Sequence, residues 1–332
     1  MSLDLALNNW RQWQVTSPLL TRPRVLSTLS EGPYTTISKL IAETHNGSAF
    51  FVVRSPNVDR KGHKAHARTL APTGVSEARH QCLAAKVQLA PALRYVCADT
   101  RTLVMDYIDD TVNSASNSNG VSANKSAHKR ATTNTNTNIN KSAPQSAHPS
   151  HASKRSALTV NALATLINGI HAIEVTGQPL DLHAQLSLYT KRAIDGGLSD
   201  SGRSKAELIN PNDAALNRAI AVLARDQQVL CHNDLHANNV LLHEGHLVAI
   251  DWEYSGIGSA YFDLVSAAQG CPGIDTEQLI ALTLGDSFCQ YTWQCAQAVF
   301  AALAWNWYQA SGVPKPTSCT FDKVAAQLEA LV

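Results

Sequence analysis

The sequence predicts an α+β chain of two lobes, a small antiparallel-sheet N-lobe followed by a mostly helical C-lobe. Residues 1–108 show strand-like alternation around a hairpin turn and hold one helical segment. Residues 157–332 carry apolar residues at helical spacing around one short strand–loop–strand piece. Between them, residues 109–156 change abruptly in composition. The expected order is therefore sheet lobe, insertion and helical lobe.

The N-lobe elements follow from a few local signals. "TTISKLIAETHNGSAFFVVRSP" predicts a hairpin, because residues 36–43 alternate, residues 49–53 are apolar, and Asn-Gly lies between them. "GVSEARHQCLAAKVQLAP" predicts a helix with Ser76 as its N-cap and Pro91 beyond its end. "LRYVCADTRTLVMDYI" adds two more strands. We therefore expect one antiparallel sheet with one helix.

The segment 109–156 is almost entirely Ser, Asn, Thr, Ala, His and Lys, and it contains no aromatic residue. Such a composition cannot bury enough apolar surface to offset the entropy of ordering. We expect a flexible insertion. Its histidines, His128, His148 and His151, are too loosely spaced for a preorganised metal site.

The C-lobe begins with three predicted helices, in "LTVNALATLINGIHAI", "LHAQLSLYTKRAI" and "NDAALNRAIAVLA". In "VLCHNDLHANNVLLH" two strands flank the polar loop "HNDLHANN", and "LVAI" returns as a third strand after Gly245. The chain closes with helices that include the Trp-rich "YTWQCAQAVFAALAWNWYQA".

Composition excludes several protein classes. A formal net charge of +1 argues against a nucleic-acid-binding protein. Seven cysteines without a C-x-x-C argue against a disulfide framework or a zinc ribbon, and favour a reducing compartment. "MSLDLALNNWRQW" is not a secretion signal, and the apolar run "AVFAALAW" is too short to span a bilayer. We expect a cytoplasmic protein without membrane association; the sequence does not indicate its oligomeric state.

The loop and the strand after it bring three oxygen ligands together. Hairpin pairing returns Asp251 beside Asn239, so that Asp234, Asn239 and Asp251 converge at one end of a small sheet. Two carboxylates and an amide oxygen suit Mg²⁺, which usually relies on substrate phosphates for part of its shell. A carboxylate left off the metal can accept a proton from an attacking hydroxyl. These groups are the equipment of phosphoryl transfer.

The pattern H-x-D-x-x-x-x-N followed by a strand-terminal I-D-W-E resembles the aminoglycoside phosphotransferase and choline kinase family, which is related to protein kinases. "CHNDLHANNVLL" and "LVAIDWEYSGIGSAYFDLVSAA" look most like its bacterial thiamine kinase and choline kinase-like members. The resemblance covers nearly the whole chain except the insertion. It implies a bilobal protein-kinase-like fold, with ATP and Mg²⁺ as cofactors and a small molecule as phosphoryl acceptor.

The resemblance implies specific roles in the C-lobe. Asp234 matches the catalytic aspartate, and His232 matches the catalytic-loop histidine that supports the loop backbone. Asn239 and Asp251 match the Mg²⁺ ligands. Asp263, in "YFDL", matches a buried aspartate that braces the catalytic loop.

The same resemblance makes residues 1–108 the nucleotide-binding lobe. Gly32, in "LSEGPYTT", lies in the expected phosphate-covering loop, and Met105 and Tyr107 lie in the expected hinge. Arg54 stands where many members carry a lysine, and Glu77 stands where a helix glutamate pairs with it.

Two departures from the family pattern affect the nucleotide site. The loop has a single glycine, Gly32, followed by Pro33, which weakens the expected cradle of backbone N–H groups. Arg54 keeps the positive charge and can pair bidentately with Glu77, but arginine and lysine are not interchangeable at a point contact. Without the resemblance, Arg54 would be an ordinary strand-edge charge and Glu77 a charge favouring a helix N-terminus.

The acceptor is predicted from the C-terminal composition. After Asp286 the chain holds only two acidic residues, Asp322 and Glu329, but three tryptophans and two tyrosines. Because aromatic faces attract single cations, this favours choline, ethanolamine or thiamine over a polycationic aminoglycoside. Aromatic residues in such a helix are more often core. The candidate substrate-side residues are His236, Trp252, Glu253 and Trp305.

Other functional classes fit less well. His232 and His236 lack the H-E-x-x-H pattern and the helix of a zinc site. "GIGSAY" lacks the third glycine of a dinucleotide fingerprint, and neither a P-loop nor a G-x-S-x-G motif occurs. A catalytically silent kinase-like binding module remains an alternative. The poor glycine loop favours it, and the intact Asp234, Asn239 and Asp251 oppose it.

Overall fold

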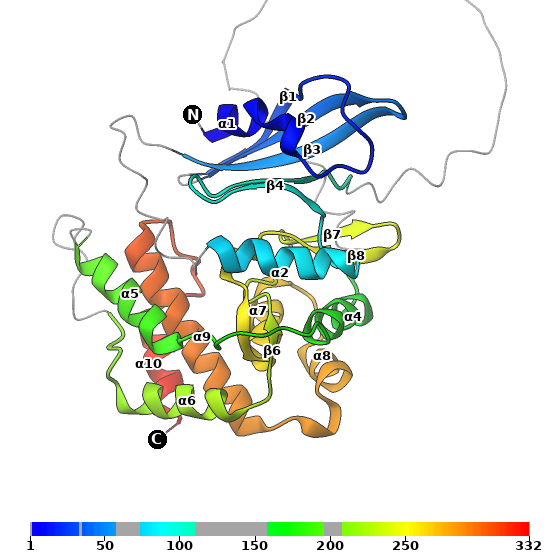
Figure 1. Cartoon of the computed structure of the whole chain (residues 1–332). Helices are drawn as coiled ribbons and strands as arrows, with labels where there is room; N and C mark the ends of the chain where they lie inside the picture. Colours follow the sequence, from blue (N-terminus) through cyan, green and yellow to red (C-terminus); the bar gives the residue numbers. More distant parts are fainter. Residues whose placement is uncertain (1, 33–34, 58–73, 110–157, 196–207, 332) are drawn as a thin grey trace, which may run out of the picture.

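The protein consists of a sheet lobe and a helical lobe stacked on each other (Figure 1). The computed structural model describes residues 2–32, 35–57, 74–109, 158–195 and 208–331. The predicted insertion 109–156 lies outside these residues apart from its first position. The predicted α+β fold with two lobes is confirmed.

The N-lobe is a five-stranded antiparallel sheet in the order β1-β2-β3-β5-β4. Its strands are β1 (Arg24–Glu31), β2 (Thr35–Thr44), β3 (Gly47–Pro56), β4 (Leu93–Cys97) and β5 (Thr102–Asp106). The hairpin predicted around "HNGS" is β2–β3, which turns at Gly47 with a φ of +106°. Glycine adopts such a left-handed φ at little steric cost.

One face of this sheet is covered by the N-terminal segment, α1 (Ser2–Asn8) and the 3₁₀ turn η1 (Trp10–Gln12), as Figure 1 shows. Trp13 packs edge-on against Phe51 with ring centroids 5.3 Å apart. Leu40, Val53 and Val104 complete this small core. Because side chains alternate along a strand, the residues between these core positions lie on the opposite face, toward the C-lobe.

The predicted N-lobe helix is α2 (Gly74–Lys86), which lies between the sheet and the C-lobe (Figure 1). It begins at Gly74, three residues before Glu77, the first helical residue that an N-cap at Ser76 implies. Ser76 is therefore inside its first turn, and its assignment as N-cap is wrong.

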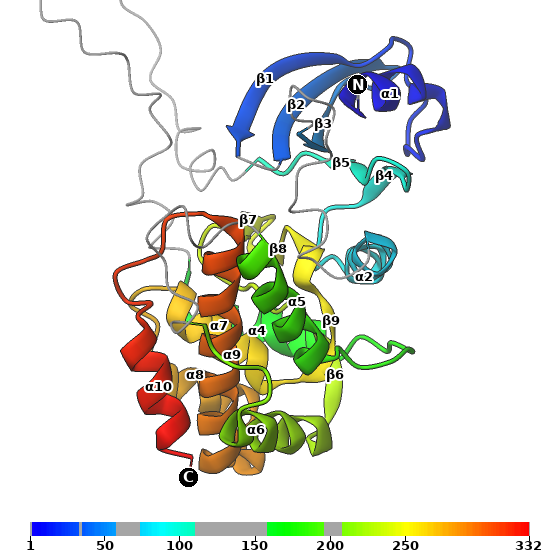
Figure 2. The same ribbon diagram turned by 90° about the vertical axis from the view of Figure 1, so that its left-hand side faces the viewer.

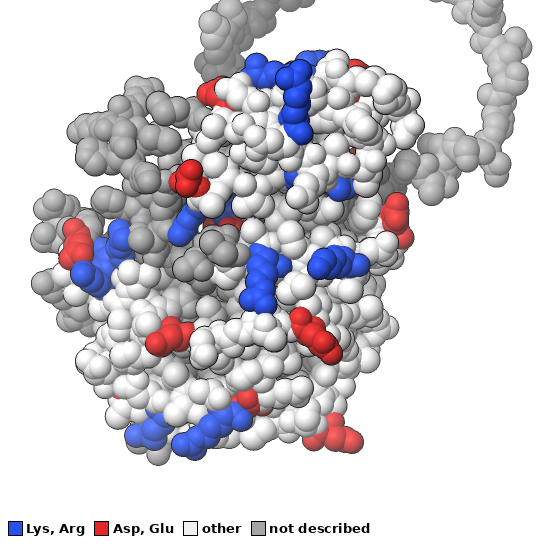
Figure 3. Space-filling view, viewed as in Figure 1, with Lys and Arg blue, Asp and Glu red and all other residues white. Residues whose placement is uncertain are grey.

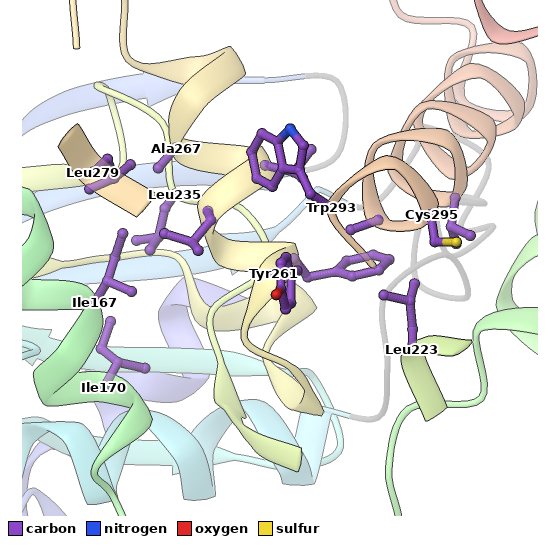
Figure 4. Packing of buried hydrophobic residues seen from close by; sticks show 14 of the residues in the cluster. Ile167, Ile170, Leu223, Leu235, Tyr261, Ala267, Leu279, Trp293 and Cys295 are labelled. Carbon is purple, nitrogen blue, oxygen red and sulfur yellow. The ribbon is translucent and has the colours of Figure 1, made fainter. Parts of the chain in front are cut away.

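The C-lobe is built around the long helix α9 (Gln290–Ser311), which packs against four other helices (Figure 2). Those helices are α5 (Leu182–Asp195), α6 (Ala214–Arg225), α7 (Tyr261–Gly270) and α10 (Phe321–Glu329). The remaining helical elements are α4 (Val160–His171), α8 (Thr276–Thr283), η5 (Trp252–Tyr254) and η6 (Gly285–Ser287). The side chains at the centre include Ile167 of α4, Leu223 of α6, Leu235, Tyr261 of α7 and Trp293 of α9 (Figure 4).

The short strands form two separate sheets, and not the single small sheet that the sequence suggested. β7 (Val240–His243) pairs with β8 (His246–Ala249) as predicted, whereas β6 (Gln228–Cys231) pairs with β9 (Gly256–Ser259). β9 was missed because "GIGS" has no strand-like alternation. Gly256 is required there, since an added Cβ would lie 2.3 Å from the Leu180 side chain. The loop 232–239 therefore joins two sheets.

The surface charge and the apolar character of the helices also bear on function. On the face shown in Figure 3, basic and acidic side chains are interspersed. Among the described segments, no helix combines the length and the apolar character needed to cross a bilayer.

Candidate active site

The loop 232–239 is held from below by a buried carboxylate. Asp263, in the first turn of α7 and fully buried, accepts hydrogen bonds from the main-chain N–H groups of His232 (3.0 Å) and Asn233 (2.6 Å). His171 of α4 lies against the same carboxylate, with its Nε2 3.1 Å from Oδ2. Asn233 has a φ of +66°, a left-handed conformation that asparagine tolerates. These contacts are the ones a bracing role for Asp263 requires.

His232 connects the loop to the strand that carries Asp251. Its Nε2 lies 3.0 Å from the Ile250 carbonyl, and its Nδ1 accepts a hydrogen bond from the Asp234 N–H at 3.3 Å. Burial lowers the pKa of His232, so the ring is neutral with its hydrogen on Nε2. Because both nitrogens are engaged, His232 acts as a positioning residue and cannot ligate zinc.

The carboxylates and the amide expected at the metal site are brought together. Asn239 donates through Nδ2 to the Asp234 carbonyl (3.0 Å) and to its Oδ2 (2.9 Å). The Ile250 N–H donates to the Asn239 main-chain carbonyl (2.9 Å), which brings Asp251, the next residue, close to Asn239. Asp251 has a φ of +64°. Such strain in a residue other than glycine is characteristic of functional positions.

The donor set fits a divalent cation. Asp251 Oδ1 is buried and accepts no hydrogen bond from any described residue; Arg54 Nη1 approaches it at 3.3 Å. A buried carboxylate oxygen without a donor is costly. The Nδ2 of Asn239 is committed to Asp234, which leaves Oδ1 as its ligand atom. Oxygen ligands of this kind suit Mg²⁺, so Asn239 and Asp251 would hold it.

Arg54 of β3 joins the two lobes through three carboxylates. Its Nη1 donates to Glu77 of α2, its Nη2 lies 2.6 Å from Glu253 Oε2, and its Nη1 lies near Asp251. The Arg54–Glu77 pair is present as the sequence suggested. Glu253 is different, because it was expected on the substrate side and is instead paired with Arg54. The guanidinium fork, with its five N–H donors, is suited to serving several carboxylates at once.

The site holds more negative charge than Arg54 offsets. Burial raises the pKa of Asp234 to about 8, and the nearby charges of Asp251 and Glu253 act in the same direction. Burial and the Asp251 charge raise the pKa of Glu253 to about 7, against the opposing effect of Arg54. Burial also raises the pKa of Glu77. A cation bound among these groups would favour their ionised forms.

This electrostatic imbalance predicts a pH-dependent response to Mg²⁺. The folded pKa values of Asp234 (about 8) and Glu253 (about 7) lie above the value of about 4 in an unfolded chain. Their contribution to stability is therefore complete below about pH 4 and is lost as pH rises toward about 8. Since Mg²⁺ competes with these protons, we expect it to raise the melting temperature more at about pH 8 than at about pH 6.

Thermal unfolding with and without Mg²⁺ at both pH values measures this effect. The control is Asp251→Asn, which removes a ligand charge and should abolish most of the shift. An equal shift at the two pH values, or an unchanged shift in Asp251→Asn, would contradict the expected cation site.

The region next to Asp234 carries His236 and several aromatic side chains. His236 Nε2 lies 3.6 Å from Asp234 Oδ2, and burial lowers the pKa of His236. Tyr254 of η5 accepts a hydrogen bond from Trp307 Nε1 at 2.8 Å, and the Trp307 ring packs edge-on against Tyr308. His236 therefore lies directly beside the Asp234 carboxylate.

Tyr189 of α5, which the sequence did not single out, belongs to the same region. Burial raises its pKa and that of Tyr254, and the charges of Glu253 and Asp234 add to both shifts. Gln185 Nε2 donates to the Tyr189 hydroxyl at 2.6 Å. Helical spacing alone could not reveal it, because an aromatic at a buried helical position reads as core.

Two tryptophans expected on the substrate side are core residues, and that expectation is wrong. Trp252 is fully buried and donates its indole N–H to the Ala249 carbonyl at 3.0 Å. Trp305 is 3% exposed and packs against Phe321. Residues two apart on a helix point to different sides. Trp305 therefore faces the core while Trp307 reaches Tyr254.

In the N-lobe, Gly32 closes the turn after β1. Its N–H donates to the Thr35 carbonyl (2.9 Å) and its carbonyl accepts from Asn57 Nδ2 (2.7 Å). Pro33 and Tyr34, the centre of the expected phosphate-covering loop, lie outside the described residues.

The expected hinge residues lie at the end of β5. Met105 is buried, and Gln81 of α2 approaches its sulfur at 3.6 Å. The N–H of Tyr107 donates to the Phe50 carbonyl at 3.1 Å. That N–H is therefore not free to bind a base.

His171, Cys231 and Asp263 form another group with possible ligand atoms, which lie within 4.8 Å of one another. The Asp263 carboxylate already accepts two main-chain N–H groups, and burial raises the pKa of the Cys231 thiol well above its usual value. The close approach of these three side chains is therefore explained by their role in supporting the loop 232–239.

Comparison with known proteins places these residues in a family context. Residues 143–299, which include the loop, Asp251 and Asp263, match the model of the Phosphotransferase enzyme family. A segment of 36 residues is 50% identical to Protein LicA of Haemophilus influenzae. That segment is 11% of this chain and spans only 14% of the relative.

Solved structures resemble the whole chain. A choline/ethanolamine kinase family protein from Mesorhizobium loti has a TM-score of 0.54 at 16% identity, covering 100% of this chain and 95% of its own. Choline kinase LicA from Streptococcus pneumoniae has a TM-score of 0.53 at 14% identity, covering 92% and 95%. A LicA structure in complex with AMP has a TM-score of 0.54 at 13% identity, covering 95% of both chains.

These identities establish the fold alone. The family match covers the part of the chain that carries the loop and the carboxylates. Residues 143–299 therefore match the Phosphotransferase enzyme family within a protein-kinase-like fold shared with choline and ethanolamine kinases, which confirms the resemblance inferred from the sequence.

Proposed function

We propose that the protein is an ATP-dependent small-molecule kinase that moves the γ-phosphoryl group of ATP to a hydroxyl of a small cationic acceptor. The observation that carries this proposal is the convergence of Asp234, Asn239 and Asp251 opposite Arg54. Nucleotide binding is further supported by the AMP complex of a protein with the same fold.

In the proposed reaction the acceptor oxygen forms a bond to the γ-phosphorus while the bond from that phosphorus to the bridging oxygen breaks and ADP leaves. Asp234 orients the hydroxyl and takes its proton, a role for which burial and the nearby carboxylates, which raise its pKa, make it a stronger base than a solvated aspartate. Mg²⁺ held by Asn239 and Asp251 would neutralise phosphate charge. Through its pairs with Glu77, Asp251 and Glu253, Arg54 holds α2 close to the segment that follows Asp251.

The hydrogen bonds of the loop support the proposed reaction because they hold Asp234 and the segment that leads to Asp251 in place. His232 fixes the main chain of Asp234 and of Ile250, and Asp263 fixes the loop from beneath. Phosphoryl transfer depends mainly on positioning and charge stabilisation. A rigid loop of this kind supplies the positioning.

A singly charged acceptor such as choline, ethanolamine or thiamine fits the aromatic region beside Asp234. Tyr254, Trp307 and Tyr308 are partly buried aromatic residues that can attract a cation, and Glu253 and Asp234 add negative charge. Glu253 is already paired with Arg54. Few carboxylates remain for an acceptor with several charges, so an aminoglycoside is the less favoured alternative.

A coupled ADP-release assay against choline, ethanolamine, thiamine and an aminoglycoside tests the proposal. We expect ADP release with one of the three singly charged acceptors. ADP release with the aminoglycoside alone would favour an antibiotic phosphotransferase. ATP binding without ADP release would reject the class of small, singly charged acceptors. Failure to bind ATP would favour the catalytically silent kinase-like module.

A further inference from the structure

The face of the N-lobe sheet that looks toward the C-lobe can be read from the strand register. Arg54 contacts Asp251 and Glu253 across the lobes, so its side of the sheet is the inner one (Figures 1 and 2). Directly paired residues of antiparallel strands carry their side chains on the same face. The two inner rows are Ile37 with Arg54 and Leu103, and Lys39 with Val52 and Met105.

Lys39 therefore lies on the inner face, one row from Arg54 toward the hinge. Residues i and i+2 of a strand are about 6.6 Å apart. A nucleotide with its base at the hinge and its phosphates at Arg54 would pass beneath this row. Lys39 is thus within reach of the middle of such a ligand.

The surroundings of Lys39 leave its charge unneutralised. Its Nζ lies 3.5 Å from the centroid of the Tyr107 ring and 4.9 Å from that of Phe50. Within the described part of the chain, no carboxylate forms an ion pair with it. Aromatic faces hold an ammonium group without cancelling its charge.

Arg54 is in the opposite situation. Three carboxylates, those of Glu77, Asp251 and Glu253, surround its guanidinium. Its positive charge is therefore largely offset before any nucleotide arrives. The phosphates of a nucleotide need a further cation in this part of the site, and a lysine ammonium is a suitable point charge for phosphate.

From this contrast, and on the basis of the proposed function, we infer that Lys39 is a nucleotide-binding residue. Its ammonium leaves the Tyr107 ring when a nucleotide binds, and pairs with the phosphates. The flexible lysine stem permits this movement, because the ring contact is a weak one at a partly exposed site. The residue thereby supplies the charge that Arg54 has committed to the carboxylates.

Binding of ATP, with Mg²⁺, and of adenosine to Lys39→Met, measured by titration calorimetry, tests the inference. We expect the Kd for ATP to rise about tenfold, as for loss of one charged contact, and the Kd for adenosine to stay unchanged. Lys39→Arg should recover most of the affinity for ATP. Lys86→Met, which removes an exposed lysine from α2, is the matched control and should bind both ligands normally.

Unchanged melting temperatures would confirm that the variants are folded. Equal losses of ATP and adenosine binding in Lys39→Met would place the residue against the base and overturn the phosphate contact, and unchanged ATP binding would remove it from the site. If the wild-type protein bound no ATP, the proposed function itself would fail, which is a distinguishable result.

Discussion

Replacing Asp234 with alanine is expected to lower the rate of phosphoryl transfer by about 10²–10⁴-fold, the usual contribution of a general base. The carboxylate lies next to the proposed acceptor region, and burial raises its pKa, which makes it a better proton acceptor than a solvated aspartate. ATP should still bind, because Arg54, Asn239 and Asp251 remain. Its affinity should be equal or higher, since a negative charge near the phosphates is removed.

Single-turnover rates together with ATP binding by calorimetry separate these two effects. The matched control is Asn238→Ala, an exposed position in the same loop whose side chain makes no hydrogen bond with Asp234 within the described part of the chain. We expect it to be fully active. Transfer at an undiminished rate in Asp234→Ala would remove this residue from the mechanism.

The second large effect is expected for Asp263→Ala and concerns stability. The substitution leaves the buried N–H groups of His232 and Asn233 without their acceptor and removes the partner of His171. An unsatisfied buried N–H group costs about 1–3 kcal/mol, and the substitution leaves two of them. We expect a loss of about 3–5 kcal/mol in the free energy of unfolding.

Urea denaturation measures this loss, and Asp263→Asn is the matched variant. The asparagine amide keeps one acceptor oxygen, but its NH₂ group would face one of the two main-chain N–H donors. We therefore expect a smaller loss of unfolding free energy than in Asp263→Ala. A loss below about 1 kcal/mol in Asp263→Ala would show that the loop does not depend on this carboxylate.

The sequence predicted the parts of the site that depend on local structure. Asn239 and Asp251 are twelve positions apart, yet one short hairpin, turning at Gly245 with a φ of +86°, brings them together. Such a hairpin follows from strand alternation around a turn. The Arg54–Glu77 pair joins a strand to a helix, and only the family resemblance suggested it.

Contacts that depend on the packing of the lobes were not predictable. Glu253 meets Arg54 across 199 positions, and no local pattern records that pairing. Trp305 and Trp307 differ by two positions on one helix, and only the neighbours of α9 decide which of them is core. Lys39 could have been noticed as a charge between Ile37 and Ile41 on one side of a strand, but its partners come from β3 and the hinge.

The proposed transfer is tested most directly by measuring ADP and phosphorylated acceptor in the same reaction by mass spectrometry. With ATP, Mg²⁺ and the active acceptor of the panel, we predict one phosphorylated acceptor for each ADP formed. Neither product should accumulate in Asp234→Ala. ADP matched by free phosphate, with no phosphorylated acceptor, would contradict a small-molecule kinase.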